Sequence, residues 1–419
     1  MLKILKWIPS KLLYNLSGHS ALQEFLRDNY GEIMAAHIRD KELLLFNYKA
    51  FYRNLYPQKS REWLEQRLGS EHKPPTVGGS EVATLLGNNP YSKIKDFYMS
   101  KLEMTSFEGN EATRWGNFFE EAVTKIVERD YKTKVWEFGS IPGIKDGEFC
   151  IQTYSPDGLF IFEDKIVLME IKSPYNREPN GQIPSHYLDQ IQIGLHTVKI
   201  ADYALFFDAL FRVSTIEDLN LNNNRYDGRI TRSHLDKNLS PKVFGLPRDI
   251  GYIFIYKKSS SIRANVKNFI VKAAPHMNTL DDILEITNDI GIYQAFVRQY
   301  LCKKKGLELD LKHIDFPPYN KCDYIGASSE VCLLNGEDPV EFLFEKVRTY
   351  LVNDIKLIAV IPWKLFNLSV CRVDKDPGYL ELVEPKIKQA IRNIFNLKKQ
   401  KISKDEFLEK KLWETSSSS

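Results

Sequence analysis

The spacing of hydrophobic and polar positions changes along the chain, and each change predicts a different kind of element. Apolar clusters within residues 1–57 predict helices that end at a Tyr-Pro turn. Helical spacing returns at 61–68 and again at 113–129, and a Pro- and Gly-rich loop at 74–79 lies between these two segments. The first third of the chain is therefore predicted to be mainly helical.

Strand patterns follow this helical region. Short apolar or alternating runs predict strands at 150–153, 158–162, 166–171 and 203–211. The second and third runs are separated by the polar turn Glu163-Asp164-Lys165, which predicts a hairpin. A helix is expected at 185–199, where Leu188 and Ile191 begin an apolar stripe. Residues 60–215 are thus predicted to be mixed α/β.

The pattern is weaker in the rest of the chain. It predicts a strand at 251–256, helices at 279–290 and 292–302, strands at 357–362 and 365–373, and a helix at 378–397. No internal repeat is visible.

Composition places the chain among ordinary folded proteins. It has 419 residues, of which 43% are hydrophobic and 27% charged, and its formal net charge is +3. This charge is too balanced to indicate a nucleic-acid partner. The five cysteines are scattered and do not have zinc-ligand spacing. No apolar run approaches the ~20 residues needed to cross a bilayer, so we expect an intracellular protein without a membrane segment.

The strongest chemical signal is Ser155-Pro156-Asp157-Gly158 followed by Glu170-Ile171-Lys172. Alternate side chains of a strand share a face, so Glu170 and Lys172 point the same way. The predicted hairpin brings Asp157 back beside Glu170. Two carboxylates and the main-chain carbonyl of Ile171 would form an all-oxygen site for Mg²⁺ or Mn²⁺.

Such a site suits phosphodiester hydrolysis. A bound cation lowers the pKa of a water molecule and offsets charge on the phosphate, while Lys172 supplies a fixed positive charge. The bare motif also occurs by chance on solvated surface hairpins. The context favours a functional site, because Glu170 interrupts an otherwise apolar strand and a buried carboxylate needs a partner.

Six motifs, in the same order, resemble those of the lambda-type exonucleases, also called YqaJ-type viral recombinases. They are SREWLEQRLGS (60–70), VGGSEVATLLG (77–87), RWGNFFEEAV (114–123), SPDG (155–158), EIKSP (170–174) and YLDQIQIGL (187–195). The segments EIKSPYNR and IPSHYLDQIQ are most similar to the corresponding segments of the family members carried by large cytoplasmic DNA viruses. The resemblance implies a PD-(D/E)xK core, restriction-endonuclease-like, in which helices flank a central mixed β-sheet.

The resemblance also implies roles for single residues. Four residues match the positions that hold a terminal 5′-phosphate in the family: Arg67, Ser80, Ser155 and Gln190. The catalytic positions of the family match Asp157, Glu170, Lys172 and, again, Gln190. Glu120 matches a position near the metal. Taken alone, Ser80 is better explained as a helix N-cap. A surface role explains Arg67 and Glu120 equally well.

A domain plan follows from the resemblance. A helical N-terminal extension is expected at 1–57 and the nuclease core at 58–215, with its closing strand and helix at 355–398. Residues 216–354 would be an insertion of unknown role, and residues 399–419 a polar tail. The extension and the insertion put the ring-shaped trimer of the phage relative in doubt.

The expected function is a Mg²⁺- or Mn²⁺-dependent 5′-to-3′ exonuclease, with two ions in each site, that acts on double-stranded DNA ends and leaves 3′ overhangs. Its expected partners are DNA ends, a single-strand annealing protein and further copies of itself, in the host cytoplasm or at a viral replication site. Basic residues at 257–267 or 303–305 could track the DNA backbone, although solvated surface charge explains each group better. An endonuclease, an RNA-degrading relative and a non-catalytic DNA-end binder are the alternatives.

Overall fold

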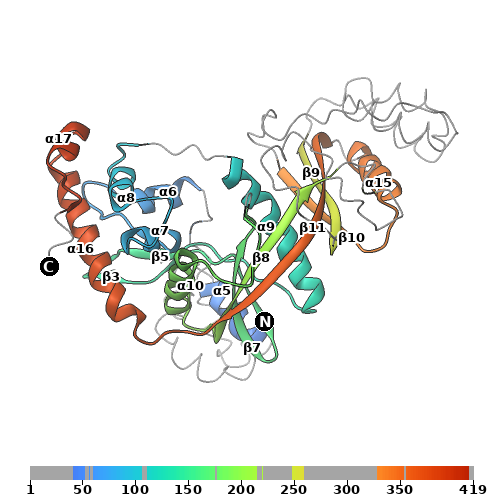
Figure 1. Cartoon of the computed structure of the whole chain (residues 1–419), viewed down its shortest axis with the longest axis horizontal. Coiled ribbons are helices and arrows are strands. Elements are labelled where there is room, and N and C mark those ends of the chain that lie inside the picture. The colour runs from blue at the N-terminus through green and yellow to red at the C-terminus, as the bar shows by residue number, and fades with distance from the viewer. Residues whose placement is uncertain are drawn as a thin grey trace, which may run out of the picture.

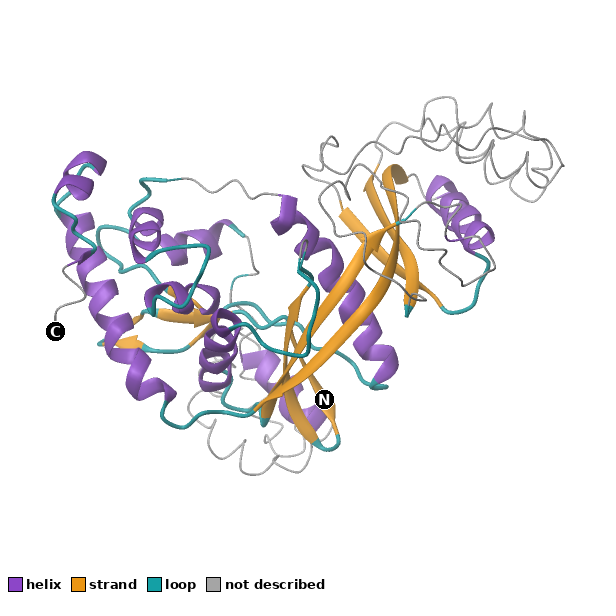
Figure 2. Cartoon of the chain, viewed as in Figure 1, coloured by secondary structure: helices purple, strands orange, loops and turns teal. Residues whose placement is uncertain are grey.

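The computed structural model describes residues 41–51, 56, 60–105, 111–174, 177–214, 219, 248–258, 328–352 and 355–414. The fold is mixed α/β, with a long curved sheet that has helices on both sides (Figures 1 and 2). In the described residues, no helix is both long enough and apolar enough to cross a membrane.

The central sheet has six strands in the order β10-β9-β11-β8-β7-β6. Strands β7 and β8 are parallel, and the other neighbours are antiparallel. The strands are β6 (Gly158–Phe162), β7 (Lys165–Lys172), β8 (Tyr203–Val213), β9 (Asp249–Lys258), β10 (Ser328–Leu334) and β11 (Ile355–Val373).

The predicted hairpin is present as β6 and β7. Two residues, Glu163 and Asp164, connect the strands with φ angles of 49° and 58°. Positive φ at both positions is the conformation of two-residue turns that match strand twist. The turn fixes the register, with Gly158 opposite Met169, so the residue before β6 lies beside the end of β7.

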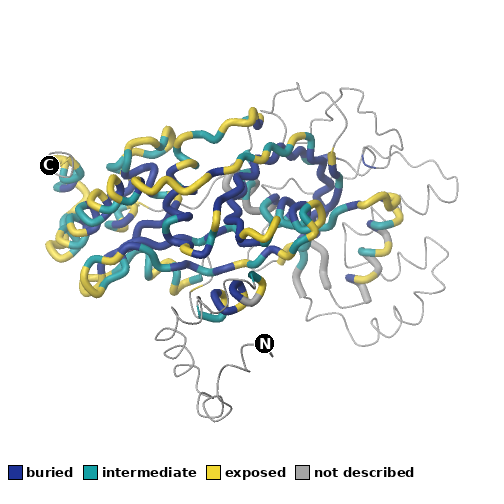
Figure 3. Tube along the Cα trace, turned by 90° about the horizontal axis from the view of Figure 1, so that it is seen from below, coloured by how far each residue is buried: buried dark blue, intermediate teal, exposed yellow. Residues whose placement is uncertain are grey.

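Each face of the sheet is covered by a different helix, and two apolar layers result. Helix α9 (Glu111–Asp130) packs on one face through Phe119, Ala122 and Ile126, which are nearly or fully buried. Helix α10 (Ser185–Thr197) covers the other face, and Leu195 contributes to that layer. Strands β7 and β8 are therefore buried on both sides, and Figure 3 shows the buried segments running through the middle of the molecule.

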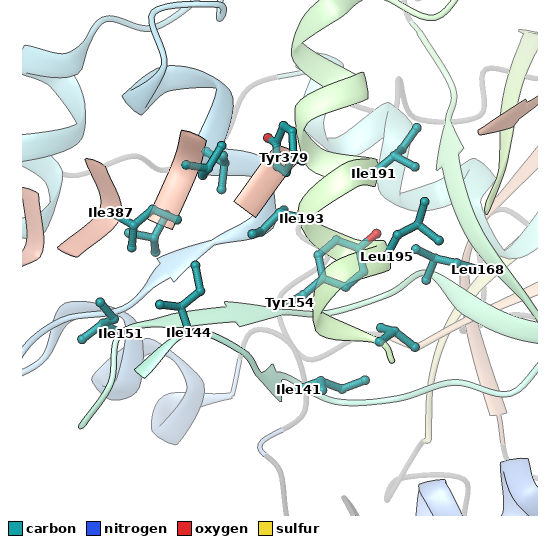
Figure 4. Packing of buried hydrophobic residues seen from close by; sticks show 14 of the residues in the cluster. Ile141, Ile144, Ile151, Tyr154, Leu168, Ile191, Ile193, Leu195, Tyr379 and Ile387 are labelled. Carbon is teal, nitrogen blue, oxygen red and sulfur yellow. The ribbon is translucent and has the colours of Figure 1, made fainter. Parts of the chain in front are cut away.

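Smaller elements surround helix α10. A three-stranded sheet has the order β1-β5-β2, and a second hairpin pairs β3 with β4. Around them lie α7 and the long α16 (Figures 1 and 4). The bounds are α5 (Lys41–Phe51), α6 (Arg61–Leu68), β1 (Val77–Gly78), α7 (Gly79–Leu85), α8 (Ile94–Lys101), β2 (Ile141–Pro142), β3 (Lys145–Asp146), β4 (Phe149–Cys150), β5 (Gln152–Tyr154), α15 (Pro339–Val352), α16 (Tyr379–Lys399) and α17 (Lys404–Glu409).

The prediction of two strands at 357–362 and 365–373 is wrong, because β11 is one strand of 19 residues. Its first half pairs with β9 and its second half with β8, and bulges adjust the register. Pro362 does not end the strand. Its carbonyl oxygen still accepts a hydrogen bond from the backbone N–H of Ser214 at 2.8 Å.

Two further regions contain elements that the sequence left undescribed or only partly predicted. Within 216–354, β9 and β10 extend the central sheet, and α15 packs near them. Within 399–419, helix α17 contains the fully buried Phe407, which stacks on Tyr98. The predicted helices at 279–290 and 292–302, the basic groups at 259–267 and 303–305, and residues 1–40 lie outside the described residues.

Candidate active site

Asp157 lies between β5 and β6 and faces the end of β7. Its Oδ2 accepts a hydrogen bond of 2.6 Å from the backbone N–H of Ile171. The hairpin register causes this contact, because it places the residue preceding Gly158 beside the residues that follow Met169. The structure thus brings Asp157 and the Glu170-Ile171-Lys172 segment together.

Glu170 is fully buried, and side-chain donors surround its carboxylate. Its Oε2 accepts a hydrogen bond from the Tyr154 hydroxyl at 2.7 Å, and its Oε1 accepts one from Gln190 Nε2 at 2.5 Å. Lys172 forms an ion pair with Oε1. A carboxylate without solvent contact requires this degree of compensation.

Lys172 carries the positive charge of this group. Burial lowers the pKa of its ammonium, but the carboxylates of Glu170 and Asp157 raise that pKa further, and the net change is above the ordinary value. The Lys172 Nζ also lies 5.2 Å from the centre of the Tyr187 ring, within cation–π range. Lys172 is therefore protonated throughout the physiological range.

The pKa of Asp157 indicates that the site carries more negative than positive charge. Burial raises its pKa well above the ordinary range, and the charges of Glu170 and Glu120 raise it further. Lys172 and the Ile171 N–H oppose this shift without cancelling it. A divalent cation would relieve the repulsion between these carboxylates, so the donor set fits a hard, oxygen-preferring metal.

The carboxylates are held by protein donors in the described geometry. Within the residues that the structure describes, no group of three His, Cys, Asp or Glu side chains has the arrangement of a ready-made metal site. Glu120, on helix α9, is half-buried and reaches Asp157 through its charge.

Tyr154 is a site residue that the sequence interpretation missed. It is 1% exposed, and its ring lies between Gly79 of α7 and Gly194 of α10. A Cβ atom on either glycine would overlap the ring, so both glycines are needed for the close approach of the two helices. A tyrosine directly before the Ser155-Pro-Asp motif was the available signal.

The four residues expected to hold a phosphate lie in two groups. Gln190 contacts Glu170, and half-buried Ser155 lies between Tyr154 and Asp157 along the chain. The Arg67 guanidinium packs against Gly78, exposed Ser80 directly follows Gly79 along the chain, and Gly79 packs against Tyr154. The N-cap explanation of Ser80 is wrong, because Gly78 is the N-cap of α7.

Glu81 is a second residue that the sequence interpretation did not single out. Its Oε2 accepts from the Gly78 N–H at 2.7 Å and pairs with Arg67 Nη2 at 2.8 Å and Lys101 Nζ at 2.9 Å. Burial raises the pKa of Glu81, but the two cations and the Gly78 N–H outweigh burial and lower the pKa to about 2. This carboxylate fixes the Arg67 guanidinium, which also lies 4.5 Å from the Trp63 ring.

Arg177 and Asp208 form a third pair missed in the sequence. The Arg177 guanidinium makes two hydrogen bonds to the Asp208 carboxylate, of 2.6 and 2.7 Å. Asp208 is opposite Lys172 in the β7–β8 register, so the pair lies directly beside the site. Its only sequence signal was an aspartate within an apolar strand.

These observations define a class of protein. A central mixed sheet carries an aspartate before one hairpin strand and a Glu-x-Lys at the end of the next, which is the PD-(D/E)xK nuclease-like arrangement. The model of the YqaJ-like viral recombinase domain matches residues 62–203, so this part of the chain is similar to that family.

Curated relatives come from African swine fever virus, and they are versions of one viral protein from different isolates. The version of the Tick/Malawi isolate is 29% identical over 211 residues, which is 43% of this chain and 59% of the relative. The version of the Pretoriuskop isolate is 32% identical over 188 residues, which is 38% of this chain and 54% of the relative. The matched region therefore spans little more than half of these viral proteins.

Two solved structures are also similar. An alkaline exonuclease (LHK-Exo) from Laribacter hongkongensis is 21% identical with a TM-score of 0.28, and the match covers 36% of this chain and 74% of that chain. The structure named SSO0001 is 14% identical with a TM-score of 0.24, covering 41% of this chain and 72% of that chain.

Proposed function

We propose that the protein is a metal-dependent exonuclease that degrades one strand of double-stranded DNA from the 5′ end and leaves 3′ overhangs. The observation that carries this proposal is the grouping of Asp157, Glu170, Lys172 and Gln190 at the end of β7, beside Tyr154. The family of residues 62–203 supports it. Overhangs of this kind would serve viral recombination, repair or genome processing, inside the infected cell.

Asp157, Glu170 and the Ile171 carbonyl would hold the metal, and Glu120 could add a carboxylate. When bound, Mg²⁺ or Mn²⁺ supplies Lewis-acid activation of water and offsets charge on the phosphate. The number of carboxylates at the site is consistent with one or two bound metal ions. The donors of Tyr154 and of the Ile171 backbone keep the two carboxylates in place.

Lys172 and Gln190 have separate tasks in this proposal. The Lys172 ammonium, protonated because of its acidic neighbours, places a fixed positive charge next to the reacting phosphate. The Gln190 amide is a neutral group that can orient water or a phosphate oxygen. Neither residue has to gain or lose a proton to perform these tasks.

The direction of degradation depends on a terminal-phosphate pocket formed by Arg67, Ser80, Ser155 and Gln190. Arg67 is suited to it because a guanidinium binds phosphate oxygens with two parallel hydrogen bonds. Glu81 already occupies one edge of the guanidinium, which fixes its orientation. A 5′-phosphate held there would place the first phosphodiester bond near Glu170.

The assembly and the outer regions are part of the same proposal. Residues 58–215 and 355–398 form the nuclease core, and residues 216–354 add a region that extends its sheet through β9 and β10. A single-strand annealing protein is the expected partner, because it would take up the exposed 3′ strand. Further copies of the chain could join it.

The test is product analysis on a linear duplex labelled at one end, with and without a 5′-phosphate, in Mg²⁺, Mn²⁺ and EDTA. We expect stepwise release from phosphorylated 5′ ends, and no release in EDTA. Arg67→Ala should remove most of the preference for the phosphate. Internal cuts would instead identify an endonuclease, cleavage of RNA would identify a relative with another substrate, and binding without cleavage would identify a DNA-end binder.

A further inference from the structure

Tyr91 stands out among the large apolar side chains that the structure describes. It is 83% exposed, while the next most exposed of these side chains, Leu382, is 59% exposed. An aromatic ring in water forgoes the stabilisation that burial would give it. The ring of Tyr91 is therefore open to a stacking partner.

The loop that carries Tyr91 is firmly held although the ring is exposed. Asn89 Oδ1 accepts from the Tyr91 backbone N–H at 2.9 Å, and its Nδ2 donates to Thr84 of α7 at 2.8 Å. Asn88 Nδ2 donates to Asp189 of α10 at 2.8 Å. These bonds order the loop in advance, which lowers the entropic cost of binding a ligand.

The ring of Tyr91 begins a line of rings that leads to the active site. It meets the His186 ring edge-to-face with centres 5.7 Å apart, and His186 lies 4.0 Å from the Tyr187 ring. Tyr187 in turn contacts the Lys172 ammonium. His186 Nε2 is buried and has no hydrogen-bond partner among the described residues.

We propose that the exposed ring of Tyr91, with His186 packed edge-to-face against it, forms a stacking platform for an unpaired nucleobase at the DNA end. The inference deepens the proposed exonuclease function and rests on it. A buried carboxylate such as Glu170 can meet the terminal phosphodiester only if the end of the duplex opens. The freed base then needs one aromatic face to stack on and a polar group beside that face.

Three properties fit a nucleobase. Every base has a π-face, so stacking on a tyrosine suits an enzyme that acts on any sequence. The imidazole can form a hydrogen bond with a base edge. Cations lie on the inner side of the platform, where Lys172 contacts Tyr187 and Arg177 lies near His186, and they would attract the phosphates of the same strand.

The test compares the wild-type protein with Tyr91→Leu and Tyr91→Phe, using fluorescence anisotropy in EDTA so that no cleavage occurs. One 5′-phosphorylated duplex has three unpaired nucleotides at its 5′ end. The other has a cross-linked terminal base pair and cannot open. Tyr56→Leu removes another exposed tyrosine and serves as the matched control.

We expect Tyr91→Leu to weaken binding of the open end about tenfold, which corresponds to the loss of one stacked base. Binding of the cross-linked end should not change, and Tyr91→Phe and Tyr56→Leu should match the wild-type protein on both duplexes. A 2-aminopurine at the unpaired position should be quenched by the wild-type protein and not by Tyr91→Leu. Because Tyr91 is exposed, the melting temperature of the variant should stay unchanged.

Equal affinities of Tyr91→Leu and the wild-type protein for the open end would overturn the inference and point to a protein partner for this ring. A similar loss on both duplexes would also overturn it, because the contact would then not require an unpaired base. Cleavage by the wild-type protein is scored separately. Its absence would refute the proposed exonuclease, while the quenching result would still decide whether a base stacks on Tyr91.

Discussion

Glu170 is the residue whose environment explains most about the site. A buried carboxylate is destabilising unless hydrogen bonds and a counter-charge compensate. Tyr154, Lys172 and Gln190 provide this compensation from three different elements. The same donors fix the direction in which the carboxylate presents its oxygens, so stability and function share the same contacts.

The Arg67–Glu81–Lys101 cluster gives a prediction at the same scale. The pKa of Glu81 in the folded protein is about 2, below the ordinary glutamate value near 4.3. A depressed carboxylate pKa contributes stability that is fully present above the ordinary value and is lost as the pH falls toward the folded one. Glu81→Gln should therefore lower the free energy of unfolding by about 2 kcal/mol at pH 7, since partial exposure screens the pairing.

Urea unfolding at several pH values measures this effect. The difference between the wild-type protein and Glu81→Gln should be constant above about pH 5 and should shrink between about pH 4.5 and pH 2. Glu65→Gln removes a surface ion pair with Arg61 and is the matched control, with little expected change. A difference that grows on acidification would show that Glu81 does not have a lowered pKa.

At the residue scale the sequence was informative where local rules apply. Strand alternation placed Glu170 and Lys172 on one face, and the polar turn predicted the return of Asp157. Tyr154 and Glu81 could not be predicted in the same way. Their partners come from elements that are distant along the chain, and no local pattern specifies those contacts.

At the scale of helices and strands, the sequence again predicted what local patterns specify and missed what depends on distant partners. The hairpin and helix α10 follow local periodicity and were predicted close to their observed bounds. Strand β11 was predicted as two strands, the first of which ended at Pro362. Its continuity depends on pairing with β9 on one side and β8 on the other, and a single segment does not reveal either partner.

Packing of α7 against α10 supplies a prediction about glycine. A methyl group on Gly194 would lie 2.5 Å from the Tyr154 ring, which Gly79 confines on its other side. We expect Gly194→Ala to destabilise the protein by about 1–3 kcal/mol through overpacking. It should also displace the Tyr154 hydroxyl from Glu170 and reduce nuclease activity.

Gly116→Ala is the matched control for this prediction. Gly116 is also helical, and its Cβ would meet no atom within 4 Å. Alanine there should leave stability unchanged or raise it by up to ~1 kcal/mol through helix propensity. Thermal melting compares the two variants, and an unchanged melting temperature for Gly194→Ala would contradict the close packing around Tyr154.

On the scale of the whole molecule, one long sheet connects the site to the remote region. Strand β11 pairs with β9 in its first half and with β8 in its second half, and β8 lies beside β7, which carries Glu170 and Lys172 (Figure 1). Helices α9 and α10 cover opposite faces, so Glu120 and Gln190 approach the end of β7 from different sides. The site therefore forms only when both helical layers are in place.

The most direct test of this account is the single-turnover rate of nucleotide release by Lys172→Ala, measured in Mg²⁺ on a 5′-phosphorylated linear duplex. Removing a fixed charge at the reacting phosphate should reduce the rate about 10²–10³-fold. Binding of the DNA end should be retained, at a temperature where melting shows that the variant is folded. A folded Lys172→Ala protein that releases nucleotides at the wild-type rate would contradict the assignment of Asp157, Glu170 and Lys172 as the catalytic centre.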